Sequence, residues 1–205
     1  MSEEKVGGDE PGRSGETCAA STVPCLLAQS PEPMAPRASL DMRVFRQTMG
    51  LFATGVTVIT TRMNGSVHGM TANSVTSLSL DPLLMLVAIN RRASMCNIVQ
   101  QAGEFVINIL NKRQEELSHY FGGAKIGPPP ASLRFEPNPD SVPYIRGTLA
   151  AIQCRIEQVV DGGDHVIVLG RVVGFHDGPP AAPLVYFRGR YCTLSDLETE
   201  TQLLV

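Results

Sequence analysis

The dipeptide Asn64-Gly65 constrains the fold of this chain more than any other short feature of its sequence. It lies between two runs rich in threonine and β-branched residues, residues 56–63 and 66–71. Asn-Gly readily adopts the two positive φ angles of a two-residue hairpin turn, and β-branched residues favour strands. The segment therefore predicts an antiparallel hairpin close to the start of the folded region.

Strand patterns recur along the rest of the chain. Residues 83–89 are almost entirely apolar, as is typical of a strand buried on both faces, and Asp81-Pro82 supplies a turn before them. Four later segments also predict strands: residues 105–110, 148–160, 165–175 and 184–194. A tight turn at residues 161–164 joins the second and third of these.

A short helix is expected before the hairpin. Ser39 or Asp41 is a suitable N-cap for it, and Gly55 is expected to end it. Apolar residues at spacings of four and three share one face of this helix: Phe45, Met49 and Phe52.

Two further short helices are expected between strands. Ser94 can cap a helix over residues 95–102 that Gly103 ends, and residues 113–121 predict another. Residues 122–141 are rich in Gly and Pro and predict a surface loop. No helix of the length that a parallel βαβ sheet needs joins successive strands. The fold class is therefore mainly β, an antiparallel barrel with a few short peripheral α-helices.

One folded domain is expected, over residues 41–195. Residues 1–40 contain no aromatic residue and are rich in Gly, Pro, Ser and Glu, so they predict a disordered N-terminal tail. Translation from Met34 or Met42 is an alternative explanation of that segment. Residues 196–205 form a short C-terminal tail.

Composition argues against several function classes. The chain has 205 residues, of which 43% are hydrophobic and 18% charged, as in an ordinary globular domain. A net charge of −3 gives no reason to expect nucleic acid or an anionic membrane as a partner. The five cysteines are scattered without a C-x-x-C pair, so no metal site is expected. With no signal peptide and no long apolar run, we expect a cytoplasmic protein.

Residues 69–81 bring many uncharged polar side chains together. Their hydroxyls and one amide both donate and accept hydrogen bonds, which suits a heteroaromatic ring with imide edges, such as a flavin. A strand with one solvent-facing side is the alternative. Other chemistries lack their motifs, since the chain has no G-x-G-x-x-G after a strand, no P-loop, no H-E-x-x-H and no G-x-S-x-G.

An ordered set of short motifs resembles one known family. The motifs are FATGVTVITT (52–61), GMTANS (69–74), SLSLDP (77–82), Asn90-Arg91, FVINIL (105–110), Phe121-Gly122, Gly163-Asp164-His165 and LVYFRGRY (184–191). Over residues 41–194 the chain resembles the flavin reductase-like family, the FMN-binding split-barrel reductases of two-component flavin monooxygenases. The resemblance implies a homodimeric split β-barrel that transfers hydride from NADH or NADPH to FMN or FAD. It also implies a separate flavin-dependent monooxygenase that receives the reduced flavin.

The same resemblance implies a set of cofactor-binding residues. Those facing the isoalloxazine ring are Gly69, Met70 and Thr71 through backbone groups and Asn73 and Ser74 through their side chains. Those lining the ribityl chain and the phosphate are Ala88, Ile89, Asn90, Arg91 and Ser94. Two aromatic residues of the predicted helix at 113–121 approach the flavin: Tyr120 and Phe121.

His165 is the implied catalytic residue. As the histidine of a Gly-Asp-His turn it would orient the nicotinamide over the flavin, with Arg190 and Tyr191 as supporting contacts. Flavin reduction needs no catalytic triad, because the cofactors carry the chemistry and the protein orients them.

Each of these roles has a plainer alternative. Asn73 can be a turn residue, Ser94 a simple N-cap, and His165 a solvated turn residue. The pair Arg91-Arg92 can be solvated, and Arg92 is taken as structural. Tyr120 and Phe121 can be core residues, the commonest fate of such side chains.

Two other functions compete with the reductase. A non-enzymatic flavin- or tetrapyrrole-binding carrier or sensor would use the same barrel but would not need the Gly163-Asp164-His165 turn. A split-barrel oxidase acting on a phosphorylated substrate would need a larger basic cluster than Arg91 and Arg92 provide.

Overall fold

The structure, a computed structural model, describes residues 41–123, 128–138, 141–192 and 194. The two expected tails and Ser39 as a helix cap lie outside the described residues. None of the described helices is long and apolar enough to cross a membrane.

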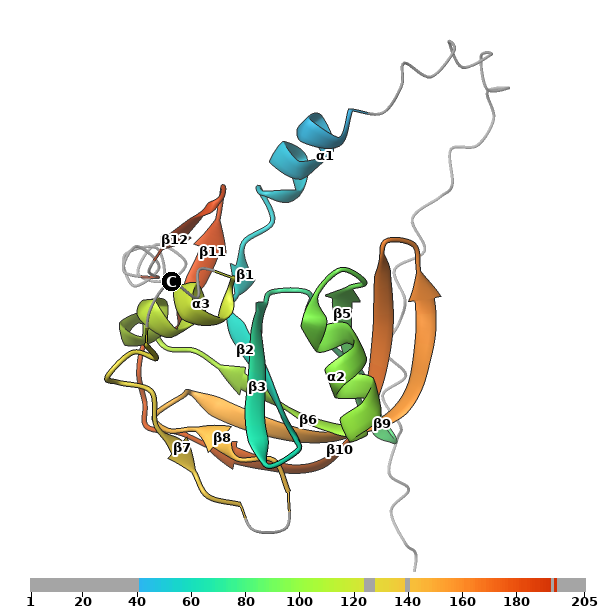
Figure 1. Cartoon of the computed structure of the whole chain (residues 1–205). Helices are drawn as coiled ribbons and strands as arrows, with labels where there is room; N and C mark the ends of the chain where they lie inside the picture. The colour runs from blue at the N-terminus through green and yellow to red at the C-terminus, as the bar shows by residue number, and fades with distance from the viewer. Residues whose placement is uncertain (1–40, 124–127, 139–140, 193, 195–205) are drawn as a thin grey trace, which may run out of the picture. The chain divides into compact units, whose positions relative to one another are not determined.

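Seven strands form the main sheet (Figure 1). They are β2 (Thr57–Met63), β3 (Ser66–Ala72), β4 (Val75–Leu80), β5 (Leu83–Asn90), β6 (Glu104–Ile109), β9 (Ala150–Gly162) and β10 (His165–Asp177). Their order across the sheet is β3-β2-β6-β9-β10-β5-β4. Every neighbouring pair is antiparallel, which confirms the predicted strand arrangement.

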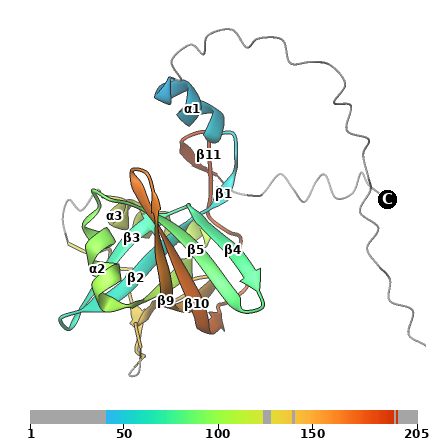
Figure 2. The same cartoon turned by 90° about the vertical axis from the view of Figure 1, so that its right-hand side faces the viewer.

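The two edge strands of this sheet are consecutive in the chain. Only Asn73 and Ser74 separate the end of β3 from the start of β4. If the sheet were flat, its six inter-strand spacings would hold these edges about 29 Å apart. The three Cα–Cα steps from Ala72 to Val75 span about 11 Å at most. The sheet must therefore curl until its edges approach at this end, which gives the predicted split barrel (Figure 2).

Two hydrogen bonds fix the linking residues against β5. The Ser74 hydroxyl donates to the Ala88 carbonyl over 2.8 Å, and the Ala88 amide donates to the Ser74 carbonyl over 3.0 Å. The polar segment between the edge strands is thus held at one end of the barrel.

The predicted hairpin turns follow from local sequence. Asn64 and Gly65 adopt φ angles of 52° and 75° and join β2 to β3 as expected. The turn predicted at 161–164 is shorter, because β9 continues to Gly162 and pairs it with His165. Only Gly163 and Asp164 form the turn, and Gly163 has a φ of 76°.

Helix α2 (Ser94–Ala102) closes the core of the barrel. Its buried residues Met95, Cys96 and Val99 share one apolar cluster with Ile59 and Phe105 of the sheet. Gly103 ends the helix in the left-handed conformation, as predicted. Ser94 is not the N-cap: it is the first helical residue, and Ala93 occupies the cap position without a side-chain hydrogen bond.

The helix expected near residues 113–121 comprises two pieces. A 3₁₀ turn η1 (Lys112–Gln114) is followed by α3 (Glu115–Phe121), which packs Leu117 and Phe121 into a second apolar cluster. The loop predicted over residues 122–141 includes one short strand, β7 (Phe135–Glu136), which pairs with β8 (Tyr144–Ile145) just after the loop.

The prediction of one strand over residues 184–194 was wrong. Two short strands, β11 (Val185–Phe187) and β12 (Arg190–Cys192), form a hairpin and join β1 (Thr54–Gly55) in a separate sheet. Arg188 and Gly189 make the turn with φ angles of 51° and 77°. Because arginine rarely adopts a positive φ, no clear local signal predicted a turn at these residues.

Helix α1 (Met42–Met49) starts where expected but ends earlier. The side chain of Asp41 accepts a hydrogen bond of 2.7 Å from the Arg43 amide, as an N-cap does. Gly50, not Gly55, occupies the C-cap. Phe52 therefore lies beyond the helix, and the three apolar residues predicted on one face are exposed in this chain.

Gly69 is required by packing between β3 and α3. A Cβ at Gly69 would lie 2.7 and 2.8 Å from two ring atoms of Phe121, which is only 8% exposed.

We expect Gly69→Ala to lower the free energy of unfolding by about 1–3 kcal/mol, because the buried ring must shift. Urea denaturation measures this. Gly55→Ala is the control, since no atom lies within 4 Å of its added Cβ, and it should change stability by less than about 0.5 kcal/mol. Equal losses in both variants would contradict the packing role.

Candidate functional site

A cavity of about 270 Å³ lies where β3 ends. Three of the predicted site residues line it, one of them from the distant strand β12: Thr71, Asn73 and Tyr191. The remaining lining residues are Val56, Ala72, Gly122 and Tyr186. The cavity therefore combines an exposed amide, a hydroxyl and two phenol rings, and the fold brings these together from the end of β3 and the distant β11–β12 hairpin.

Hydrogen bonds through Ser118 hold two walls of this cavity. The Thr71 hydroxyl donates to the Ser118 carbonyl over 2.7 Å, and the Ser118 and Tyr191 hydroxyls share a hydrogen bond of 2.7 Å. Ser118 is fully buried on α3. The network ties β3 and β12 to the same helix.

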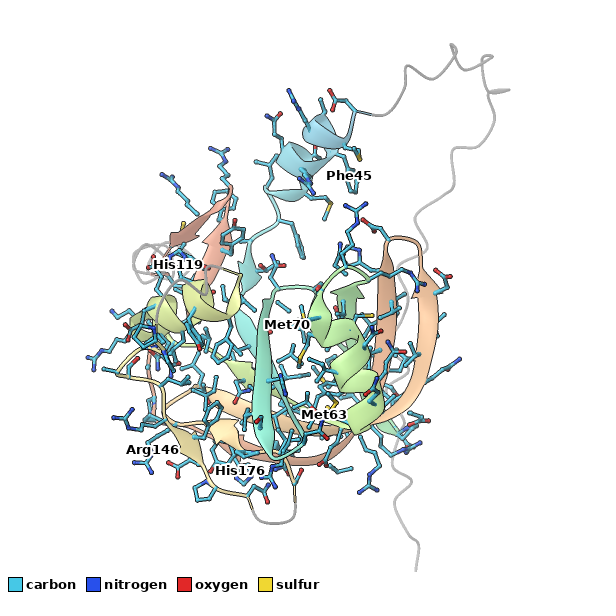
Figure 3. All side chains as sticks on the ribbon, in the orientation of Figure 1. Phe45, Met63, Met70, His119, Arg146 and His176 are labelled. Atoms are coloured by element: carbon cyan, nitrogen blue, oxygen red, sulfur yellow. The ribbon has the colours of Figure 1, made fainter. Side chains whose placement is uncertain are left out.

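Aromatic contacts further orient Tyr191. Its ring meets those of His119 and Tyr186 edge-on, with centroids 4.9 and 5.4 Å apart. His119 lies on α3, across the molecule from α2 (Figure 3). These contacts favour one placement of the Tyr191 ring in the cavity wall.

Asn73 keeps most of its hydrogen-bonding capacity. Its side chain is exposed, and its Nδ2 donates to the Thr54 hydroxyl over 3.2 Å. An amide can make four hydrogen bonds, so a ligand can still use the others. Ser74, by contrast, donates its hydroxyl proton to the Ala88 carbonyl and offers a ligand its oxygen as an acceptor.

The structure places the two predicted aromatic residues of α3 in the second apolar cluster. Phe121 packs on Gly69, and Tyr120 is half-buried and meets Phe121 edge-on, with centroids 5.0 Å apart. Met70 is half-buried and packs against the barrel core. The packing alternative thus accounts for Phe121 and for Gly69 without a ligand.

A second group of predicted residues lies around the turn between β9 and β10. His165 pairs with Asn90 across the sheet. The Arg91 guanidinium reaches the turn, where Nε donates to the Gly163 carbonyl over 2.8 Å and Nη2 lies 2.9 Å from Asp161 Oδ1. This contact joins the end of β5 to the residues that carry His165.

Asp164 fixes the orientation of the His165 ring. His165 Nδ1 lies 2.7 Å from Asp164 Oδ1, and the hydrogen bond and charge of His165 lower the pKa of Asp164. Because an ionised carboxylate only accepts hydrogen bonds, Nδ1 carries the proton and Nε2 faces away from this partner. The His165 side chain is 38% exposed, so a ligand can reach it.

The other predicted residues differ in what they can offer. Ile89 is buried in the barrel core and can contribute only backbone groups. Ser94 is exposed at the first turn of α2, and Arg190 is exposed on β12. No further contact in the described residues tests a role for them.

The sequence prediction missed Tyr186, Ser118 and Asp161. Tyr186 lies within the family motif at residues 184–191, but the motif did not predict that Tyr186 lines the cavity. Ser118 shares a helical face with Phe121, three positions later, which is a signal of burial. Asp161 was recognised only as part of a turn.

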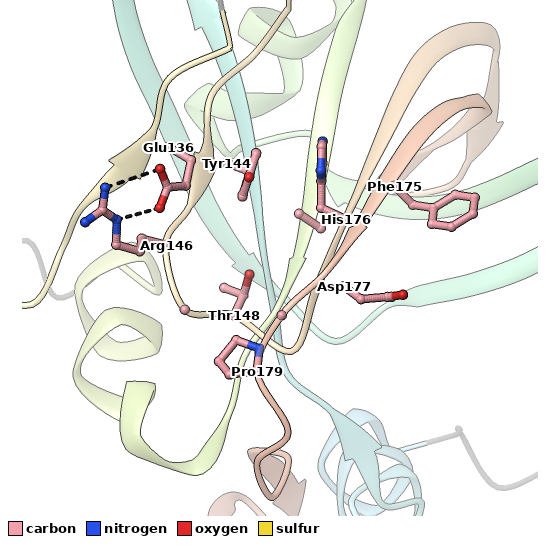
Figure 4. Close-up of a pocket in the computed structure, with 11 residues that line it drawn as sticks. Glu136, Tyr144, Arg146, Thr148, Phe175, His176, Asp177 and Pro179 are labelled. Atoms are coloured by element: carbon pink, nitrogen blue, oxygen red, sulfur yellow. Dashed lines mark hydrogen bonds and ion pairs between the residues drawn. The ribbon is translucent and has the colours of Figure 1, made fainter.

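A larger hollow of about 570 Å³ lies elsewhere, beside β8 and the end of β10 (Figure 4). Tyr144 stacks on His176 with centroids 4.6 Å apart, and Arg146 forms an ion pair with Glu136. None of the predicted site residues lines it. The larger hollow and the predicted site therefore do not coincide.

Comparison with known families and proteins is consistent with the motifs. A family model described as a flavin reductase like domain matches residues 49–195. The chain is 35% identical over 147 residues to the reductase component of 4-hydroxyphenylacetate 3-monooxygenase from Thermus thermophilus, covering 72% of this chain and 93% of the relative. It is 40% identical over 154 residues to an NADH-dependent flavin reductase from a Rhodococcus species, covering 73% and 84%.

Solved structures also resemble the fold. Flavin reductase PheA2 in its native state is 42% identical, with a TM-score of 0.72, covering 77% of this chain and 100% of that one. The NADH:FAD oxidoreductase SgcE6 from Streptomyces globisporus, in complex with NAD and FAD fragments, is 31% identical with a TM-score of 0.70. That match covers 76% of this chain and 94% of SgcE6.

The contacts of Asp161 predict a measurable titration. The Gly163 amide, and then Arg91, lower the pKa of this carboxyl. Because the folded-state pKa is depressed, the contacts persist above the ordinary value of about 3.9 and are lost as pH falls through the lower, folded-state value. Carbon-13 NMR of the Asp161 carboxyl should give a midpoint below about 3.9, and Arg91→Gln should raise it. A midpoint at or above the ordinary value would contradict these contacts.

Proposed function

The chain belongs to the flavin reductase like domain family, and on this basis we propose that it transfers hydride from NADH to FMN or FAD. The reduced flavin then passes to a separate flavin-dependent monooxygenase. The names of the relatives and of SgcE6 support NADH as the donor and include both FMN and FAD as acceptors. NADPH stays the alternative donor that the sequence left open.

One observation carries the proposal: both predicted halves of the site lie at the same end of the barrel. Ser74 lies opposite Ala88 on one side of β5, and His165 lies opposite Asn90 on the other. Two inter-strand spacings and a two-residue offset separate Ser74 from His165 by about 12 Å along the sheet. A flavin beside Ser74 and a nicotinamide beside His165 would therefore occupy one continuous region.

The residues present fit a flavin. Asn73 offers an exposed amide, and the cavity next to it is lined by two tyrosine rings and by Thr71. Such a mixture of apolar walls with a few placed polar groups is typical of cofactor sites. A bound flavin would supply the electron-accepting ring, and the protein would supply binding and orientation.

We propose that Asn73 and Ser74 bond the polar edge of that ring. Asn73 can both donate and accept, which matches the alternating donors and acceptors of an imide edge. The backbone near Met70 and Thr71, and the segment from Ala88 to Asn90 with Ser94, line the remainder of the proposed site. Tyr120 and Phe121 support it from α3 through packing.

His165 is proposed to orient the nicotinamide. Its Nδ1 proton is held by Asp164, so the Nε2 side of the ring is the one that a ligand can contact. Arg190 and Tyr191 are proposed as supporting contacts. A positioned imidazole raises the fraction of bound NADH in a reactive geometry without taking part in proton transfer.

The wider assignments follow from family membership. We propose a homodimer, because small barrels often complete a binding site at an interface. We also propose a cytoplasmic location and a single reductase domain over residues 41–195.

The activity itself is tested by mixing the purified protein with NADH and excess FMN. Loss of the nicotinamide absorbance at a rate proportional to protein concentration is expected, and repeating the assay with NADPH and with FAD ranks donors and acceptors. A matched sample without protein corrects for direct reduction. No loss of absorbance above that sample would reject the reductase and favour a flavin carrier.

Two variants separate the proposed halves of the site. His165→Ala should raise the KM for NADH about tenfold while changing flavin affinity less than about twofold, because the ring contacts only the nicotinamide. Asn73→Ala should weaken flavin binding about tenfold by removing bonds to its polar edge. Steady-state kinetics and flavin titration measure both. Equal losses of both functions in either variant would indicate a structural role.

A further inference from the structure

Arg91 does not present a free cation to the region proposed for the flavin phosphate. Its Nε donates to the Gly163 carbonyl, its Nη2 pairs with Asp161, and its backbone amide donates to the Asp164 carbonyl over 3.0 Å. Asp161 also accepts a hydrogen bond of 2.9 Å from the Gly163 amide. Three of these four contacts are made by the two-residue turn that precedes His165, and the fourth joins Arg91 to Asp161, two residues before Gly163.

We propose that Arg91 and Asp161 are positioning residues that hold the His165 turn, rather than ligands of a cofactor phosphate. The inference rests on the proposed function, in which His165 orients the nicotinamide. It reassigns Arg91 and gives Asp161 a role in use of the nicotinamide cofactor.

The charges of the two side chains favour the positioning role. A phosphate that approached Arg91 would meet the Asp161 carboxylate already bound to the same guanidinium, and the two anions would repel each other. If Asp161 and Arg91 only hold the turn, no phosphate approaches them and this repulsion does not arise. The Gly163 amide and Arg91 lower the pKa of Asp161, which shows that both contacts favour its ionised form.

The geometry links Arg91 to the His165 ring through one residue. The guanidinium of Arg91 donates to the Gly163 carbonyl and its backbone amide donates to the carbonyl of Asp164, whose side chain bonds Nδ1 of His165. The turn is exposed at the tip of two strands of 13 residues each, so few packing contacts restrain it. An exposed ion pair alone contributes little stability, but several contacts to one two-residue turn restrict its conformation.

Two substitutions and their combination test the proposal. Arg91→Gln and Asp161→Asn should each raise the KM for NADH about fivefold, and the double variant should be no worse than the more impaired single variant. The kcat and the dissociation constant for FMN should change less than about twofold. Such non-additivity is expected when two residues act as one unit.

A direct phosphate contact predicts a different pattern. Arg91→Gln would then weaken FMN binding, whereas Asp161→Asn would leave it unchanged or strengthen it by removing a competing anion. That result would overturn the proposal, as would an unchanged KM for NADH in Asp161→Asn. Glu157→Gln is the matched control, because it breaks another surface ion pair of the same hairpin, Arg171 with Glu157 at 2.9 Å, and should change neither constant.

A second readout does not depend on activity. In protein without flavin or NADH, Arg91→Gln and Asp161→Asn should both shift the amide NMR signals of Gly163 and His165, whereas Glu157→Gln should leave them unchanged. If wild-type protein failed to reduce flavin, these shifts would still test whether Arg91 and Asp161 hold the turn before His165. Unchanged Gly163 and His165 signals in both variants would refute it.

Discussion

The two-residue link between β3 and β4 is the constraint on which the rest of the structure depends. These strands are the two edges of a seven-stranded sheet. A link of two residues can join them only if the sheet is curled. Curling creates the interior that α2 fills with Met95, Cys96 and Val99. It also holds Asn73 and Ser74, the residues of the link, at the end of the barrel where β5 meets the His165 turn. The same two-residue link thus closes the fold and forms the polar wall of the proposed site.

Two sets of contacts join distant parts of the chain at that end. Ser118 connects Thr71 of β3 with Tyr191 of the late hairpin, and Arg91 connects the end of β5 with the turn before His165. Ser118 and Asp161 can affect cofactor binding without touching a ligand, because each bonds to residues that form or support the proposed site. This arrangement suits a reductase, in which the cofactors react with each other and the protein mainly determines how they are placed.

Local signals in the sequence predicted the parts of the fold that short-range chemistry decides. Asn64-Gly65 and Gly103 both adopt the positive φ angles expected of them, and Asp41 caps its helix. The predicted cap positions of Gly55 and Ser94 were wrong. Gly50 is the C-cap of α1, and Ala93 is the N-cap of α2. The fit between Gly69 and Phe121 and the pairing of Arg91 with Asp161 join residues at least 52 positions apart, so no local pattern could reveal them. The ordered family motifs predict a region for the site, but they do not distinguish residues that would bind a cofactor from residues that support them.

We propose that the β3–β4 link forms the wall that binds the flavin ring. A crystal structure of the protein soaked with FMN would show whether it does. Electron density for the isoalloxazine is expected at the barrel end, with its polar edge within hydrogen-bonding distance of Asn73 and Ser74. Density for the ring elsewhere, for example in the larger hollow beside Tyr144 and His176, would contradict it.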